Sequence, residues 1–272
     1  MTRPPWFIEL LKKLFPHRFH IAKLTHVPII GDLIDHMFFE GDEVYYLPKA
    51  EVIEINKKVE KPEDMILPYQ VVEYFIEKAS YRVVMNFCIC RASSNCKNYP
   101  INIGCIFLGE AAKKIDPWLG RPVTKEEALE HARKAREAGL VHMIGREKLD
   151  TIWLGVTPGN KLLTICNCCP CCCLWKILPH VSSKIADKVK KMPGVTVKIN
   201  YDKCVGCGIC ANNICFVDAI HMINGKPVIT DDCRGCGRCV EICPQGAIEL
   251  NVEDKKFIEE TRKRISSLVD VT

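Results

Sequence analysis

The chain of 272 residues contains eighteen cysteines, and their distribution limits its fold more than any other feature. They form a first group at residues 88–105, a dense run at 166–173 and a C-terminal group at 204–243. In TICNCCPCCCLWK, six cysteines occupy eight positions. Neighbouring cysteines are difficult to join by unstrained disulfides, and free thiols at this density are prone to oxidation. The sequence therefore predicts metal binding or thiol redox chemistry.

The rest of the composition favours a cytoplasmic protein. Glu9, Lys12 and Lys13 interrupt the N-terminal apolar residues, and no run approaches the roughly 18 apolar residues that span a bilayer. Clustered cysteines in a reducing compartment are more often metal ligands or redox catalysts than disulfides. A net charge of +5 suits an acidic redox partner and does not indicate nucleic-acid binding.

The N-terminal third predicts short helices followed by extended chain. Residues 6–39 read as amphipathic helices broken at Pro16 and Pro28, and FIELLKKLF carries basic residues opposite its apolar ones. Such a helix either packs on its own domain or makes peripheral contact with a membrane surface. EVYYLPKAEVIEINKKVEKPEDM predicts extended segments and a linker at Pro62. PYQVVEYFIEKASYRVVMNF predicts a helix that ends where the cysteines begin.

The middle of the chain contains the clearest helix signal. In TKEEALEHARKAREAG, Thr124 and Glu127 form a capping box and Gly139 provides a stop. TIWLGVTPGNKLLTIC then predicts a hairpin around Pro158 and Asn160. Helix followed by hairpin resembles a winged-helix arrangement, a similarity of shape that does not imply DNA binding.

A repeat in the C-terminal part carries the strongest signal for a cofactor. CVGCGICANNIC and CRGCGRCVEICP lie 29 positions apart, and the second matches the C-x2-C-x2-C-x3-C-P run that holds [4Fe–4S] clusters. Glycines between the cysteines allow the backbone to wrap around a cluster. Paired zinc ribbons are the competing interpretation, but their knuckles are usually separated by a longer loop.

Residues 198–251 resemble the bacterial dicluster ferredoxins. The resemblance implies two [4Fe–4S] clusters, each taking its fourth ligand from the other repeat. It assigns the first cluster to Cys204, Cys207, Cys210 and Cys243. It assigns the second cluster to Cys233, Cys236, Cys239 and Cys215. One extra residue precedes Cys215, and Phe216 replaces the usual proline, so we expect a bulge in the short helix there.

The other ten cysteines predict an upstream metal site. The first group is Cys88, Cys90, Cys96 and Cys105, and four thiolates suffice for one cluster or one zinc. The dense run is Cys166, Cys168, Cys169, Cys171, Cys172 and Cys173. In extended chain Cys166 and Cys168 share a face, but no single face holds all six. Two metals, a bridging cluster or a mixture of ligands and free thiols remain open. We expect both groups to build one site with one or more further iron–sulfur clusters, whose negative charge Arg91 can stabilise.

The whole chain is similar to a poorly characterised family of 4Fe–4S dicluster proteins of anaerobes, methanogens among them. The similar segments are FFEGDEVYYLPKAEVIEIN, CICR, GLVHMIGREKLDTIW and CNCCPCCC. This resemblance implies iron–sulfur content and an anaerobic redox setting, and it leaves the substrate open.

These observations predict an α+β chain: a helical, winged-helix-like, cysteine-rich N-terminal region followed by a ferredoxin-like dicluster domain. The predicted units are 1–61, 62–194, 195–252 and a C-terminal helix at 253–272. The favoured function is electron transfer with a redox partner protein. The alternatives are an oxidoreductase that reduces a disulfide or sulfur compound, and a redox-sensing regulator. No nucleotide-binding loop or catalytic pair is evident, and we expect packing or surface roles for His131 and His142. The oligomeric state stays open.

Overall fold

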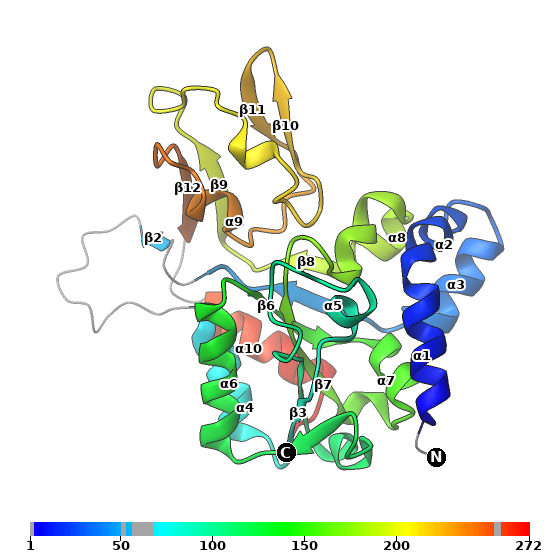
Figure 1. The fold of residues 1–272 in the computed structure, drawn as a ribbon. Coiled ribbons are helices and arrows are strands. Elements are labelled where there is room, and N and C mark those ends of the chain that lie inside the picture. The colour runs from blue at the N-terminus through cyan, green and yellow to red at the C-terminus, as the bar shows by residue number, and fades with distance from the viewer. Residues whose placement is uncertain (1–2, 50–52, 56–67, 253–256) are drawn as a thin grey trace.

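The computed structural model describes residues 3–49, 53–55, 68–252 and 257–272 (Figure 1). A seven-stranded sheet forms the body, the ferredoxin-like part stands above it, and three N-terminal helices lie at one side. The helices are α1 (Pro5–Leu14), α2 (Arg18–Leu24), α3 (Ile30–Phe38), α4 (Tyr69–Lys78), α5 (Ile89–Ser93), α6 (Lys125–Glu137), α7 (Lys148–Leu154), α8 (Ser183–Ala186), α9 (Arg238–Glu241) and α10 (Phe257–Leu268). Short 3₁₀ turns are η1 (Phe15–His17), η4 (Glu110–Lys114), η5 (Gly159–Lys161), η6 (Leu174–His180) and η7 (Ile209–Ala211).

The strands of the body pair in the order β5-β3-β4-β7-β6-β1-β8. Neighbours run antiparallel except β1 and β8, which are parallel. Their bounds are β1 (Glu43–Tyr46), β3 (Arg82–Met85), β4 (Ile106–Leu108), β5 (Gly120–Pro122), β6 (Val141–Arg146), β7 (Leu163–Cys168) and β8 (Val189–Lys191). The central strands β6 and β7 are buried almost throughout, which agrees with their apolar composition.

The two faces of this sheet pack against different parts of the chain. Alternate side chains of a strand point to opposite faces. Ile144 and Ile165 face α4, α6 and α10 in the largest apolar cluster. Met143 and Cys168 belong to a different cluster, which contains Trp175 of η6 and Phe216 of the ferredoxin-like part. Cys166 and Cys168 therefore share the face away from α4, α6 and α10, as the alternation predicted.

The N-terminal helices follow the prediction: α1 ends before Pro16, and α3 begins after Pro28. Their inner side chains pack on the body, with Ile8 and Ala22 buried. Their outer side chains are unusually apolar for an exposed surface. The exposed large apolar residues on this segment are Trp6, Leu10, Leu14, Ile21, Leu24, Val27, Ile29, Ile30, Leu33 and Met37.

Several secondary-structure predictions for the middle of the chain differ from the observed structure. The helix predicted up to the first cysteines ends at Lys78, because the β-branched run at Val83 and Val84 forms β3. The predicted hairpin is wrong: its first half is α7, and β7 pairs with β4 and β6. The winged-helix arrangement is not confirmed. The capping box of Thr124 and Glu127 is confirmed at the start of α6.

The ferredoxin-like part contains β9 (Val195–Ile199), β10 (Ile220–Ile223), β11 (Lys226–Ile229) and β12 (Ile248–Val252). β10 pairs with β11, and β12 pairs with β9 and with β2 (Ile53–Ile55) from far upstream. α10 then returns to the body, where Arg264 bonds Glu43 of β1 at 2.6 and 2.8 Å. The chain therefore crosses between body and ferredoxin-like part more than once. The predicted unit boundaries stay a prediction, and the predicted linker at Pro62 lies outside the described residues.

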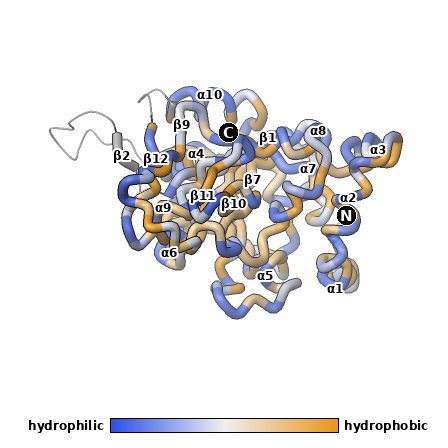
Figure 2. Tube along the Cα trace, turned by 90° about the horizontal axis from the view of Figure 1, so that it is seen from above, coloured by the Kyte–Doolittle hydropathy of each residue, from blue (hydrophilic) through white to orange (hydrophobic). Residues whose placement is uncertain are grey.

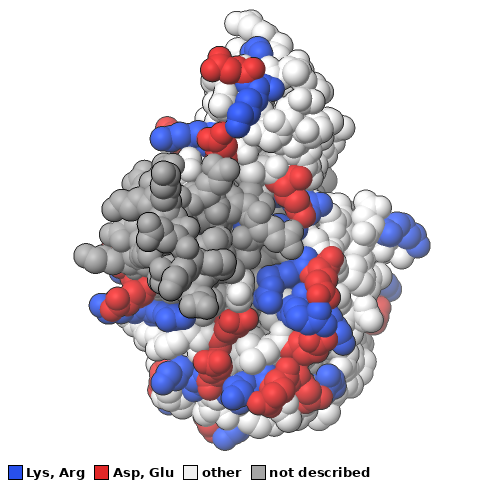
Figure 3. Space-filling view, turned by 90° about the vertical axis from the view of Figure 1, so that its left-hand side faces the viewer, with Lys and Arg blue, Asp and Glu red and all other residues white. Residues whose placement is uncertain are grey.

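Figure 2 shows hydrophobic chain gathered at the centre and hydrophilic chain along the outer parts of α6 and α10. On the face drawn in Figure 3, basic and acidic side chains lie next to each other. On α6, Arg133 pairs with Glu130 at 2.7 Å. No helix among the described residues is long and apolar enough to cross a membrane.

The capping box gives a prediction about α6. Thr124→Ala removes the acceptor for the Glu127 amide, which lies 3.2 Å from the Thr124 hydroxyl. N-cap loss costs about 1 kcal/mol, so hydrogen exchange of the first α6 amides should become roughly fivefold faster. Lys125→Ala, one position later, is the control and should leave this exchange unchanged. Equal effects of both variants would contradict the capping role.

Candidate metal centres

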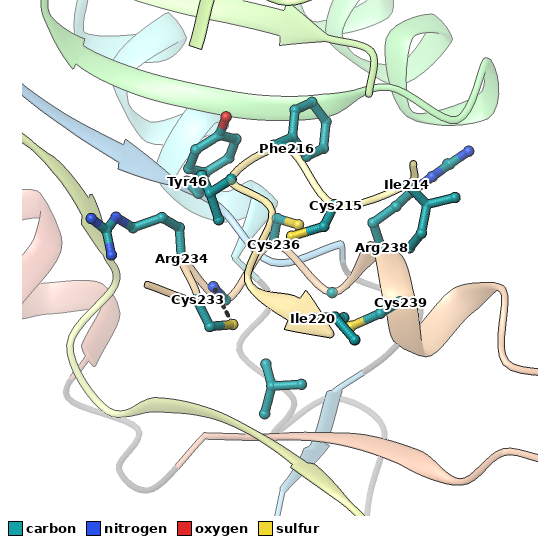
Figure 4. A pocket seen from close by; sticks show the side chains of 14 residues that line it. Tyr46, Ile214, Cys215, Phe216, Ile220, Cys233, Arg234, Cys236, Arg238 and Cys239 are labelled. Carbon is teal, nitrogen blue, oxygen red and sulfur yellow. Dashed lines mark hydrogen bonds between the residues drawn. The ribbon is translucent and has the colours of Figure 1, made fainter. Parts of the chain in front are cut away.

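Cys215, Cys233, Cys236 and Cys239 line one small pocket in the ferredoxin-like part (Figure 4). The sulfurs receive backbone hydrogen bonds: the Ala219 N–H donates to Cys215 Sγ at 3.3 Å, and the Gly235 N–H donates to Cys233 Sγ at 3.4 Å. Donors of this kind stabilise thiolates bound to a cluster. The four residues match the set that the ferredoxin resemblance assigns to the second cluster.

Cys204, Cys207, Cys210 and Cys243 line the equivalent pocket of the first set. The Ala247 N–H lies 3.3 Å from Cys243 Sγ, which repeats the contact of Ala219 with Cys215. The extra residue before Cys215 is accommodated by a left-handed Asn213, with φ of 56°, and by a 3₁₀ turn where the second repeat has α9. Both sets fit the chemistry of a cubane, although ligation itself stays a prediction.

The two upstream cysteine groups lie side by side and divide into two sets. The six-thiol set comprises Cys88, Cys90, Cys105, Cys166, Cys168 and Cys173, which all line one cavity. Cys169 lines this cavity as well, but its sulfur belongs to a second, compact set. Within the six-thiol set, Cys105 Sγ lies 3.4 Å from Cys166 Sγ, and Cys173 Sγ lies 3.4 Å from Cys168 Sγ. A hydrogen bond from Cys90 lowers the pKa of Cys88 to about 6, against the effect of burial. Three members come from each sequence group.

The four-thiol set comprises Cys96, Cys169, Cys171 and Cys172, whose sulfurs all lie within 4.8 Å of one another. Cys171 Sγ is 3.6 Å from Cys96 Sγ and 3.5 Å from Cys169 Sγ. Burial raises the pKa of Cys172 to about 11. Cys96 belongs to the first sequence group and the other three to the dense run, so this set also joins both groups.

Arg91 lies between the two thiol sets and is completely inaccessible to solvent. Its guanidinium donates to the carbonyls of Pro100 at 2.8 Å, Asn167 at 2.7 Å and Ile103. Burial alone lowers the pKa of Arg91, but the thiols of Cys88, Cys169 and Cys105 raise it above its usual value. A permanent cation therefore sits next to members of both sets, where it can balance the charge of thiolates.

A polar network supports this region from the other face of β7. Asn167 donates to the Gly104 carbonyl at 2.7 Å, and His142 Nδ1 lies 2.8 Å from Asn167 Oδ1. Burial lowers the pKa of His142 to about 4. His131 Nε2 also contacts the Gly104 carbonyl, at 2.9 Å. Both histidines therefore hold the loop before Cys105 in place, which agrees with the packing role expected for them.

A cavity of about 360 Å³ adjoins the six-thiol set. Its wall is mostly apolar and comes from α1, α2, α3, α7 and η6. Arg18 contributes a cation, stacked between the rings of Phe15 and Phe19 at 4.1 and 4.4 Å, and its buried Nε has no partner among the described residues. Glu147 and Asp150 contribute carboxyl groups, and burial raises the pKa of each.

Tyr46 connects the six-thiol set with the second ferredoxin set. It is completely buried, and its ring centroid lies 5.3 Å from that of Phe216. Figure 4 shows Tyr46 and Phe216 above Cys215 and Cys236. Burial raises the pKa of Tyr46, and the thiols of Cys173, Cys168, Cys236 and Cys215 raise it further, so this phenol lies between the two sets.

Sequence reasoning missed Tyr46, Arg18, Glu147 and Asp150. None of them stands beside a cysteine in the chain, so spacing carries no signal for them. Arg18 alone had a local sign, because it lies between Phe15 and Phe19 in an amphipathic segment. Arg91 was found from its position after Cys90.

The fold and the C-terminal sets define an iron–sulfur protein of the ferredoxin type. The sequence-family model of the 4Fe-4S binding domain matches residues 226–249. A ferredoxin of Methanothermococcus thermolithotrophicus is 40% identical over 59 residues, which cover 20% of this chain and 97% of that protein. An uncharacterised ferredoxin of Methanocaldococcus jannaschii is 36% identical over 63 residues, 22% of this chain and 100% of that protein. Through its C-terminal domain, the chain belongs to the 4Fe–4S ferredoxin family.

An uncharacterised protein of Methanocaldococcus jannaschii is 47% identical over 56 residues, 20% of this chain and 14% of that protein. No solved structure matches the chain significantly. The ferredoxin domain confirms the predicted iron–sulfur character and supports a role in electron transfer. These three similarities each cover about a fifth of the chain, so they do not describe the body.

Proposed function

We propose that this protein carries electrons between a redox partner protein and an upstream metal centre in its own body. The two ferredoxin sets hold one [4Fe–4S] cluster each, and the six-thiol set holds a further iron–sulfur centre. Bound clusters supply one-electron redox chemistry. The setting is an anaerobic cytoplasm, as the cysteine content favours.

The position of Tyr46 is the observation that supports this proposal most directly. Electron transfer slows steeply with distance, so centres that exchange electrons lie close together and are joined by packed protein. Tyr46 contacts Phe216 beside the second ferredoxin set and shares an apolar cluster with Cys168 and Cys173 of the six-thiol set. One buried side chain therefore lies between both sets of predicted ligands.

Replacement of Tyr46 tests this route. Tyr46→Leu removes the ring between the two sets, so electrons delivered to the ferredoxin domain by a photoreductant should reach the upstream centre more slowly. Rapid-freeze EPR measures the transfer. The lost packing should also reduce folding stability by about 1 to 3 kcal/mol.

Tyr46→Phe is the matched control, because it keeps the ring and removes only the hydroxyl. We expect it to transfer electrons at nearly the normal rate. Iron content must be unchanged in both variants. Unaltered transfer in Tyr46→Leu with full iron would contradict the proposed route.

The cavity favours a second candidate, an oxidoreductase that reduces a disulfide or another sulfur compound at the six-thiol centre. Its volume of about 360 Å³ lies within the range of small-molecule sites, and such sites typically combine an apolar wall with a few polar groups. Each disulfide would take up two electrons from the reduced protein and two protons from water, and would leave as two thiols. Arg18 fits an anionic group on such a substrate.

Two disulfide probes test this candidate. The reduced holoprotein should reduce dithiodipropionate, which carries carboxylates, faster than neutral hydroxyethyl disulfide. Arg18→Gln should lower the rate with dithiodipropionate about tenfold, because one hydrogen bond to a charged group is lost. Lys13→Gln, an exposed change on α1, should have no effect. Absence of turnover with both probes would leave electron transfer as the function.

We further propose that α1, α2 and α3 contact an anionic membrane surface. Their exposed apolar residues include Trp6 and Ile29, which are 66% and 82% exposed. Lys13 and Lys23 lie on the same helices, are exposed and pair with no acidic side chain in the described chain. Exposed apolar residues with interspersed basic ones are typical of helices that lie in a membrane interface.

Vesicle binding tests the membrane contact. The protein should co-sediment with vesicles that contain anionic lipid and less with purely zwitterionic ones. Serine at both Leu10 and Ile29 should weaken binding about tenfold or more, because two apolar side chains that would be buried in the lipid are lost. Ile223→Ser, which changes an exposed apolar residue of β10, is the control. Binding that is equal in all variants would contradict the assignment of this face.

A further inference from the structure

We propose that the four-thiol set binds a single zinc ion and is distinct from every iron–sulfur centre of the protein. The set is compact: all four sulfurs lie within 4.8 Å of one another. Three neighbouring pairs are at 3.5 or 3.6 Å, and each involves Cys171. In the part of the chain that the structure describes, no other group of potential ligands is gathered this closely.

This spacing fits one tetrahedral ion better than a cubane. A Zn–S bond of about 2.3 Å in a tetrahedron puts the sulfurs about 3.8 Å apart. In a [4Fe–4S] cluster each thiolate binds a different iron at a different corner, so the sulfurs are spread around the whole cluster. The cysteines of each ferredoxin set are likewise spread around a pocket, whereas the four sulfurs of the four-thiol set lie close to one another.

The surroundings also suit a closed zinc–thiolate site. Four thiolates and one zinc ion carry a net charge of −2, which needs hydrogen-bond donors and a nearby cation. Backbone groups of Asn98 and Tyr99 lower the pKa of Cys96 against the effect of burial, and Cys169 raises the pKa of Arg91, so donors and a cation lie next to the set. Apolar packing covers the other side, where Cys169 and Cys172 lie against Ala135 and Leu140. Four protein thiolates leave no open position, which is typical of structural sites.

Such an ion would fix the geometry of the neighbouring six-thiol set. Cys96 lies in the loop after α5, and Cys169 directly follows β7, so the ion would join these two segments. Tyr99, three residues after Cys96, accepts a hydrogen bond from Arg238 of the ferredoxin-like part at 2.5 Å. Zinc has no redox chemistry of its own, and it would protect four thiols from oxidation. The inference therefore goes beyond the proposed electron transfer and does not depend on it.

Metal analysis of single-cysteine variants tests the proposal. The full chain is purified anaerobically from cells supplied with iron and zinc, and both metals are measured. We expect about one zinc per chain, in the stoichiometry of a Cys₄ site. Cys96→Ser should lose this zinc and keep the iron. Cys90→Ser, a change in the six-thiol set, should keep the zinc and disturb the upstream iron signal in EPR.

Cys171→His keeps the test informative if Cys96→Ser does not fold. Zinc also accepts three cysteines and one histidine, so this variant should retain the ion. Cobalt bound in place of zinc should give the visible spectrum of a tetrahedral thiolate site, changed in Cys171→His. Three results would overturn the proposal: the wild-type protein contains no zinc, it contains iron in place of zinc, or Cys96→Ser and Cys90→Ser lose zinc equally. Those results would not contradict the proposed electron transfer, because electron transfer is measured at the iron centres.

Discussion

The buried guanidinium of Arg91 is the interaction on which the arrangement of the ten upstream thiols depends. Clustered thiolates repel each other, and a low-dielectric interior makes this repulsion stronger. Arg91 is inaccessible to solvent and lies beside Cys88 and Cys105 of one set and Cys169 of the other. Three backbone carbonyls hold it there, so its charge is fixed where the thiols need it. One cation thus allows two thiol sets to occupy the same interior.

The sheet explains how distant cysteines come together. β7 delivers Cys166 and Cys168 on the face away from α4, α6 and α10, and its neighbour β4 starts immediately after Cys105. The dense run then turns out of the sheet and meets the loop that holds Cys96. β1, on the far side of β6, places Tyr46 between these thiols and the ferredoxin-like part. The order of the strands in the sheet, rather than the order of residues in the chain, therefore brings the thiol sets and Tyr46 together.

Local sequence signals were reliable where the interactions are local. The capping box at Thr124, the breaks at Pro16 and Pro28 and the cysteine repeat each depend on residues within a few positions of one another. The predicted hairpin is wrong because Lys148–Leu154 forms its backbone hydrogen bonds within α7. β7 instead pairs with residues of β4 that lie 55 or more positions upstream, and with nearer ones in β6. Propensity does not encode those pairings, since tertiary packing decides which edge a strand meets.

The sequence by itself determined that the C-terminal part is a ferredoxin domain, because its ligand loops are short and the spacing of cysteines is set by the cluster. It also determined that ten further thiols had to be accommodated. Only the tertiary structure decided their division into four and six, the position of Arg91 between the sets and the position of Tyr46 beside them. These are distances between segments far apart in the chain. They follow from the way the two faces of one sheet are packed, which no local pattern contains.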